Sequence, residues 1–140
     1  MSRTLGVDLG ERRIGLAISD PLGTIASPYL VIERQGNPAA DYKAIIAAAV
    51  DGDAMKIVVG LPRSLSGRKG PAERSAISEC DAIRALVPET IEVEMFDERL
   101  TTVIAQRSLI EAGVHRKNRK KIVDKVAAAV MLQSFLDSHG

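Results

Sequence analysis

The stretch GVDLGERRIGLAISD, residues 6–20, decides the expected fold, because it has the pattern of two short strands joined by a tight turn. β-type runs at 3–9 and 14–19 are separated by GERR, which predicts an antiparallel hairpin. Side chains alternate between the two faces of a strand, so Asp8 shares its face with the glycines two positions before and after it. We therefore expect one carboxylate on an otherwise bare surface of the sheet.

The rest of the chain extends this hairpin into a mixed sheet. Hydrophobic patterning predicts, in chain order, a strand at 27–33, a helix at 37–50 that Asn37 caps and Pro38 opens, a strand at 55–62, a helix at 71–86, a strand at 90–96, and helices at 100–112 and 119–137. This order predicts an α/β fold whose sheet has three antiparallel strands followed by parallel strands, with helices on both faces. No repeat or break in composition divides residues 1–140, so a single domain is expected.

Composition limits the classes of protein to consider. The 140 residues carry a formal charge of +1 and are 46% hydrophobic, which is typical of a soluble globular domain. The single cysteine, Cys80, cannot form an internal disulfide and lies on an expected helix between two acids, which indicates a residue that either packs in the core or fills the surface. Neither a signal peptide nor a run of about 18 apolar residues occurs, so we expect a cytoplasmic protein without a membrane segment. Only 3% of the residues are aromatic, which disfavours a nucleic-acid-binding surface on which bases stack against aromatic side chains.

Acidic residues recur where a binding site can form. Asp97 and Glu98 follow the strand at 90–96, and ligand sites in open α/β sheets lie at the carboxyl ends of parallel strands. Asp124 in the last helix should point toward the sheet, because it shares a helix face with the apolar residues Ala127, Ala128, Met131 and Phe135. Three gathered carboxylates need a compensating cation. A divalent metal such as Mg²⁺, alone or as a pair that clamps a phosphodiester, meets that need.

Each of these features also has a purely structural interpretation. The glycines beside Asp8 either leave room for metal-bound water and a phosphate, or form a flat face on which a helix packs. Asp124 could instead complement the helix dipole or pair with Lys120 or Lys121. The two acids after the strand at 90–96 could simply end that strand and cap the next helix.

Two basic clusters lie next to the acidic positions in the expected fold. RKNRKK, residues 116–121, precedes the helix of Asp124, and RSLSGRKG, residues 63–70, follows the strand at 55–62. Such clusters attract phosphate backbones, although a solvated surface loop is the alternative. His115 belongs to the first cluster's loop, and His139 is expected in a frayed tail. The residues expected to contact nucleic-acid phosphates are Arg63, Arg68, Lys69, Arg99, Arg116, Lys117, Arg119 and Lys120.

Four segments together resemble the YqgF family, also called RuvX, almost from end to end: GVDLGERRIGLAISD, IVVGLPRSLSG, FDERLTTVIAQRSL and KKIVDKVAAAVMLQSFLD. The resemblance implies a ribonuclease H-like fold and a metal-dependent nuclease. It implies that Asp8, Glu98 and Asp124 are the catalytic ligands of Mg²⁺ or Mn²⁺, with Asp97 as the alternative to Glu98. It also implies a nucleic-acid partner. The first expectation is the 5′ end of the 16S ribosomal RNA precursor, and the alternative is a Holliday junction.

Two other functions remain open on the sequence alone. The first is a non-catalytic RNA-binding module of ribosome maturation, which the three acids disfavour because a phosphate binder gains nothing from carboxylates in its groove. The second is an actin-like or sugar-kinase ATPase, whose phosphate-binding hairpin resembles residues 6–20 but which needs a second, similar domain. The oligomeric state is also open, since an RNA-processing enzyme can act as a monomer and a junction resolvase is expected to be a two-fold homodimer.

Overall fold

The computed structural model describes residues 2–62, 70–97 and 119–139, with the side chains of 119–122 excepted. Its elements are, in chain order, β1 (Arg3–Leu9), β2 (Arg13–Ser19), β3 (Ala26–Glu33), α1 (Pro38–Asp51), β4 (Ala54–Leu61), α2 (Pro71–Leu86), β5 (Glu92–Asp97) and α4 (Arg119–His139). All five expected strands and three expected helices are confirmed, and the expected helix at 100–112 lies outside the described residues. β5 starts two residues later than expected, because Ile91 N–H still donates to the carbonyl of Pro88 in a turn.

The strands form one five-stranded sheet in the order β3-β2-β1-β4-β5. β2 pairs antiparallel with both β1 and β3, whereas β4 pairs parallel with β1 and with β5. The expected mixed sheet is therefore confirmed. In the β1–β2 register, Asp8 lies directly opposite Gly15, which places both residues on the same face of the sheet.

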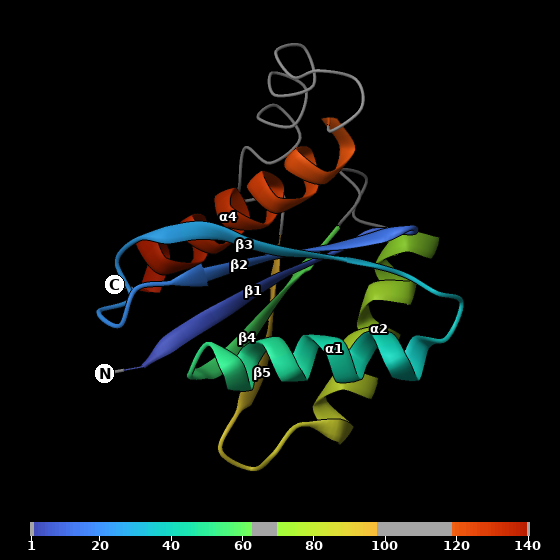
Figure 1. Ribbon diagram of the computed structural model, residues 1–140, viewed down its shortest axis with the longest axis horizontal. Helices are drawn as coiled ribbons and strands as arrows, with labels where there is room; N and C mark the ends of the chain where they lie inside the picture. Colours follow the sequence, from blue (N-terminus) through green and yellow to red (C-terminus); the bar gives the residue numbers. More distant parts are fainter. Residues whose placement is uncertain (1, 63–69, 98–118, 140) are drawn as a thin grey trace.

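The two faces of the sheet carry different side chains and different helices. α1 and α2 cover one face and α4 covers the other (Figure 1). Under α1 and α2 the sheet contributes large aliphatic residues: Leu5, Val7, Ile14, Leu16, Ile57 and Val59. Cys80 of α2 is fully buried in this cluster, and burial raises the pKa of its thiol, which agrees with a packing role. Under α4 the sheet contributes Ala17, Val58 and Phe96.

Glycines let α4 approach the sheet closely. A Cβ added to Gly6 would lie 2.9 Å from Cβ of Leu132, and one added to Gly15 would lie 2.1 Å from the carbonyl oxygen of Asp124. The expectation of a bare surface around Asp8 is therefore wrong, since the helix lies across it. At Gly6 and Gly15 the structure supports the helix-packing interpretation of the glycines rather than open space for a ligand.

The helix ends follow the local sequence signals with one exception. The side chain of Asn37 accepts a hydrogen bond from the backbone N–H of Ala40, with Pro38 at the first position of α1, as expected. His139, in contrast, is not part of a frayed tail. Its ring stacks on Phe135 with the centroids 4.0 Å apart, and α4 runs to this residue. No helix in the described part of the chain is long and apolar enough to cross a membrane.

Candidate active site

Asp8 lies in the middle of the sheet, on the face that α4 covers. It is 9% exposed and sits near the end of the buried part of β1. The backbone of Asp8 is paired with β2 opposite Gly15, and the preceding residue, Val7, is paired with both β2 and β4. A carboxylate at such a position costs free energy unless it has polar or cationic partners.

Gly15 has no side chain, and this lets the backbone of Asp124 lie directly against β2, next to the strand that carries Asp8. The Asp124 carbonyl and Cβ would lie 2.1 and 3.3 Å from a Cβ at Gly15, and Gly15 is directly opposite Asp8 in the antiparallel pair. Opposed positions of this kind have Cβ atoms about 5 Å apart, so Asp124 lies over the residue that is paired with Asp8. The expected inward orientation of Asp124 is confirmed by burial of the residues on the same helix face: Ala127, Ala128, Met131 and Phe135.

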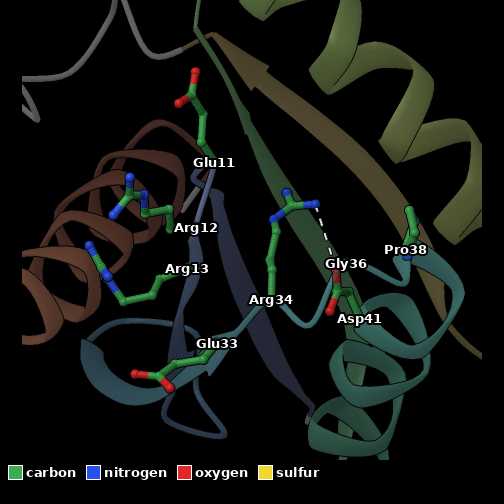
Figure 2. A pocket seen from close by; sticks show the side chains of 8 residues that line it. All are labelled: Glu11, Arg12, Arg13, Glu33, Arg34, Gly36, Pro38 and Asp41. Atoms are coloured by element: carbon green, nitrogen blue, oxygen red, sulfur yellow. Dashed lines mark ion pairs between the residues drawn. The ribbon is translucent and has the colours of Figure 1, made fainter.

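Arg13 is the charged partner of Asp124, and the sequence reasoning missed it. Its Nε donates to Oδ2 of Asp124 at 2.9 Å, and the two side chains are 22% and 20% exposed. Figure 2 shows Arg13 directed toward α4. The signal was present in the sequence, because alternation along β2 puts Arg13 on the same face as Gly15. The alternative partners considered from the sequence, Lys120 and Lys121, have side chains outside the described residues.

The middle acid of the expected triad, Glu98, also lies outside the described residues. Its alternative, Asp97, is the last residue of β5. Phe96 packs with the α4 cluster, whereas Val93 and Met95 pack with the cluster under α1 and α2. Alternation therefore assigns Asp97 to the face opposite Asp8. Within residues 2–62, 70–97 and 119–139, no three His, Cys, Asp or Glu side chains gather as a metal site.

The expected phosphate contacts cannot be located in the described part of the chain. Arg119 and Lys120 open α4, but their side chains are not described. The other predicted contacts lie outside the described residues: Arg63, Arg68, Lys69, Arg99, Arg116 and Lys117. A cleft of about 510 Å³ (Figure 2) is lined by Glu11, Arg12, Arg13, Glu33, Arg34, Gly36, Pro38 and Asp41. Its arginines are matched by as many carboxylates, so this lining does not favour a polyanion.

A second arginine of the same cleft belongs to a different cluster. Nη1 and Nη2 of Arg34 donate to the two carboxylate oxygens of Glu79 at 2.6 and 3.1 Å, and the hydroxyl of Tyr42 donates to the same carboxylate at 3.0 Å. Asp41 lies 3.8 Å from the guanidinium. Burial and then the hydrogen bond to Glu79 raise the pKa of Tyr42 to about 12. These contacts join the end of β3 to both α1 and α2.

A family model described as "RuvX: Holliday junction resolvase" matches residues 2–138. The chain belongs to the RuvX family. A curated relative from Clostridium botulinum (strain Hall), described as "Putative pre-16S rRNA nuclease", is 46% identical over 136 residues, which are 97% of each chain. A relative with the same description from Mycobacterium sp. (strain KMS) is 43% identical over 136 residues, covering 96% of this chain and 79% of its own. The family resemblance read from four segments of the sequence is thus confirmed.

Solved structures confirm the expected ribonuclease H-like fold of the RuvX chain, which it shares with RuvC. RuvC of T. thermophilus in complex with a Holliday junction substrate superposes with a TM-score of 0.59 at 13% identity, over 100% of this chain and 97% of RuvC. The yeast mitochondrial Holliday junction resolvase Ydc2 superposes with a TM-score of 0.52 at 13% identity, over 99% of this chain and 81% of Ydc2. At these identities the likeness concerns the fold alone.

Proposed function

We propose that this RuvX protein is a metal-dependent endonuclease that hydrolyses phosphodiester bonds at the 5′ end of the 16S ribosomal RNA precursor in the cytoplasm. One structural observation carries the proposal: Asp8 and Asp124 come from distant parts of the chain, and both lie next to Gly15 on one face of the sheet. The choice of substrate is supported by the description of the relatives that are 43% and 46% identical over nearly the whole chain.

The donor set fits a hard divalent cation. Carboxylate oxygens are the ligands that Mg²⁺ and Mn²⁺ prefer, and Asp8 and Asp124 supply two such groups on one face of the sheet. We assign the third ligand to Glu98 rather than Asp97, and the alternation of β5 supports this choice because it turns Asp97 to the opposite face. A bound metal would supply Lewis-acid polarisation of the phosphate and a water of lowered pKa.

The chain's own residues then have separate tasks. Asp8 is held by the central strand, and Asp124 is held by close packing of α4 on Gly15, so neither carboxylate needs the substrate to position it. No side-chain nucleophile is required, because water is the attacking group. Neutralisation of the substrate phosphates is assigned to the basic residues named from the sequence, Arg63, Arg68, Lys69 and Arg99, with Arg116, Lys117, Arg119 and Lys120 attracting the backbone at longer range.

A second candidate function is resolution of four-way DNA junctions. It is favoured by the description of the matching family model, and a fold shared with RuvC is compatible with it. The two functions use the same acids and differ in the shape of the nucleic acid that must be held. A direct comparison of the two substrates therefore separates them.

The test is cleavage of a labelled precursor RNA fragment and a labelled four-way DNA junction in parallel, with Mg²⁺, with Mn²⁺ and with a chelator. Wild type is compared with Asp8→Asn and with Asp51→Asn, a matched loss of an exposed aspartate at the end of α1. We expect RNA cleavage that needs metal, falls at least about 1,000-fold in Asp8→Asn and is unchanged in Asp51→Asn.

Junction cleavage with the same dependence on Asp8 would replace RNA processing by the second function. Binding of RNA without cleavage in either metal would mean that the acids do not form a working site, and would favour a non-catalytic binding module. Equal activity of the two aspartate variants would remove Asp8 from the mechanism.

A further inference from the structure

An ion pair joins Arg13 to Asp124, one of the proposed metal ligands. Arg13 projects from β2 on the face that carries Gly15, and Gly15 is directly opposite Asp8. Arg13 therefore lies on the same face of the sheet as Asp8 and contacts Asp124. Its contact with Asp124 is direct, with Nε 2.9 Å from Oδ2, in a setting where both side chains are only about one-fifth exposed.

We propose that Arg13 is a built-in counter-ion that occupies Asp124 in the metal-free protein and that a divalent cation must displace. This inference rests on the proposed function, because it takes Asp8 and Asp124 as metal ligands. The positive charge of Arg13 compensates the gathered carboxylates when no metal is bound. The same charge repels an incoming divalent cation and competes with it for Oδ2 of Asp124.

The number of hydrogen bonds makes this pair exchangeable. Arg13 donates one hydrogen bond to Asp124, from Nε, rather than the two parallel bonds of a bidentate arginine–carboxylate pair. Breaking one charge-assisted bond at a partly exposed position costs little, so a cation that gains several carboxylate ligands can exceed it. Arg13 is thus a positioning residue that acts on the metal site through Asp124.

The opposite role makes the opposite prediction. If Arg13 served only to orient Asp124 for the metal, removing it would loosen the carboxylate and weaken metal binding. If Arg13 competes with the metal, removing its charge strengthens metal binding although the metal-free protein loses an ion pair. The sign of the change in metal affinity therefore separates the two roles.

The experiment titrates the metal-free protein with Mn²⁺ alone, by calorimetry and by the electron paramagnetic resonance signal of unbound Mn²⁺. Four variants are compared with wild type. Arg13→Gln removes the charge, Arg13→Lys keeps it, Arg12→Gln removes the same charge from the exposed neighbouring residue, and Asp8→Asn removes a proposed ligand. Circular dichroism establishes that each variant is folded.

We expect the Mn²⁺ dissociation constant of Arg13→Gln to fall at least about fivefold. Arg13→Lys and Arg12→Gln should stay within about twofold of wild type. The rise in melting temperature on adding Mn²⁺ should be larger for Arg13→Gln than for wild type, starting from a lower metal-free value.

An Arg13→Gln dissociation constant equal to that of Arg12→Gln, or higher than wild type, would overturn the counter-ion role while leaving the metal site intact. Failure of the proposed function has a different signature. In that case wild type would show no Mn²⁺ binding that Asp8→Asn abolishes, and both the metal site and the counter-ion role would be rejected. If Arg13→Gln does not fold, a fivefold or greater weakening in Arg13→Lys would count against the proposal, because that variant retains the charge.

Discussion

Two arginines that line one cleft, Arg34 and Arg13, form ion pairs of different kinds on opposite sides of the sheet. Arg34 grips Glu79 through two nitrogens, and the same carboxylate accepts from Tyr42. Arg13 contacts Asp124 through Nε. In Figure 2 Arg34 lies with Asp41 on the side of α1, whereas Arg13 extends toward α4.

The difference teaches how one residue type serves structure in one place and chemistry in another. The Arg34 cluster joins the end of β3 to two helices, and its acceptors are occupied by fixed partners, so it resists exchange. The Arg13 pair lies on the same face of the sheet as a second carboxylate, Asp8, and two carboxylates on one face are suitable ligands for a divalent cation. The Arg34 cluster, in which Glu79 accepts from two residues, stabilises the fold, whereas Asp124 accepts from Arg13 through Nε alone.

Removing the carboxylate of Glu79, which Arg34 and Tyr42 share, should have the largest effect on stability. We expect Glu79→Ala to lower the free energy of unfolding by about 3 kcal/mol, because the mostly buried Arg34 loses its bidentate partner and Tyr42 loses its acceptor. Arg13→Gln, without metal, should cost about 1 kcal/mol or less. Urea unfolding of both variants measures the contrast. Similar losses for the two variants would show that the pairs do not differ in kind.

The close approach of α4 to the sheet provides the next test. Gly15→Ala should cost about 2 kcal/mol, because the new methyl group would lie 2.1 Å from the Asp124 carbonyl and the helix must shift. Gly70→Ala is the matched control, since a Cβ there meets nothing within 4 Å and its φ of −82° suits alanine. Thermal unfolding gives the stabilities, and Mn²⁺ titration should show weaker binding for Gly15→Ala alone. Unchanged stability and metal affinity would mean that Gly15 does not set the position of Asp124.

The Tyr42 hydroxyl should make the stability of the protein depend on pH at high pH. Its pKa is about 12 in the folded protein, against about 10 in an unfolded chain. The folded state thus holds the proton more tightly, so this stabilisation is complete below about pH 10 and is lost as the pH rises to about 12. We expect wild type to lose about 1–2 kcal/mol relative to Tyr42→Phe across that range. Urea unfolding at pH 9 to 11.5, with Tyr29→Phe as the matched control, measures it. A constant difference between wild type and Tyr42→Phe would contradict the shifted pKa.

The sequence predicted the sheet, the face of Asp8 and the inward orientation of Asp124, because each depends on a local pattern. Alternation in the segment 6–20 fixes the hairpin and the face of Asp8, and the apolar spacing after Asp124 fixes its inward orientation. The order of strands follows from the antiparallel start and the helical crossovers. These features need no knowledge of distant contacts.

The missed features all depend on how α4 meets the sheet. The sequence does not reveal that Gly6 and Gly15 receive the backbone and side chains of a helix more than 100 positions later. For the same reason the local sequence indicates Lys120 or Lys121 as partner of Asp124, whereas Arg13 of β2 forms the ion pair. His139 was expected to fray because a chain end usually does, and its stacking on Phe135 is again a tertiary contact.

The two ion pairs should also differ in how salt changes the stability that each contributes, and this is the smallest effect that we predict. Asp124→Asn in the metal-free protein removes a single-bond pair whose members are 22% and 20% exposed, so we expect a loss of about 1 kcal/mol at low salt. About 1 M NaCl shortens the screening length to roughly 3 Å and should nearly abolish that loss. The larger loss in Glu79→Ala should persist, because much of it comes from buried groups left without partners rather than from long-range attraction. A salt-resistant loss in Asp124→Asn would mean that its carboxylate is held as firmly as Glu79, and a pair held that firmly would be a poor counter-ion for a metal to displace.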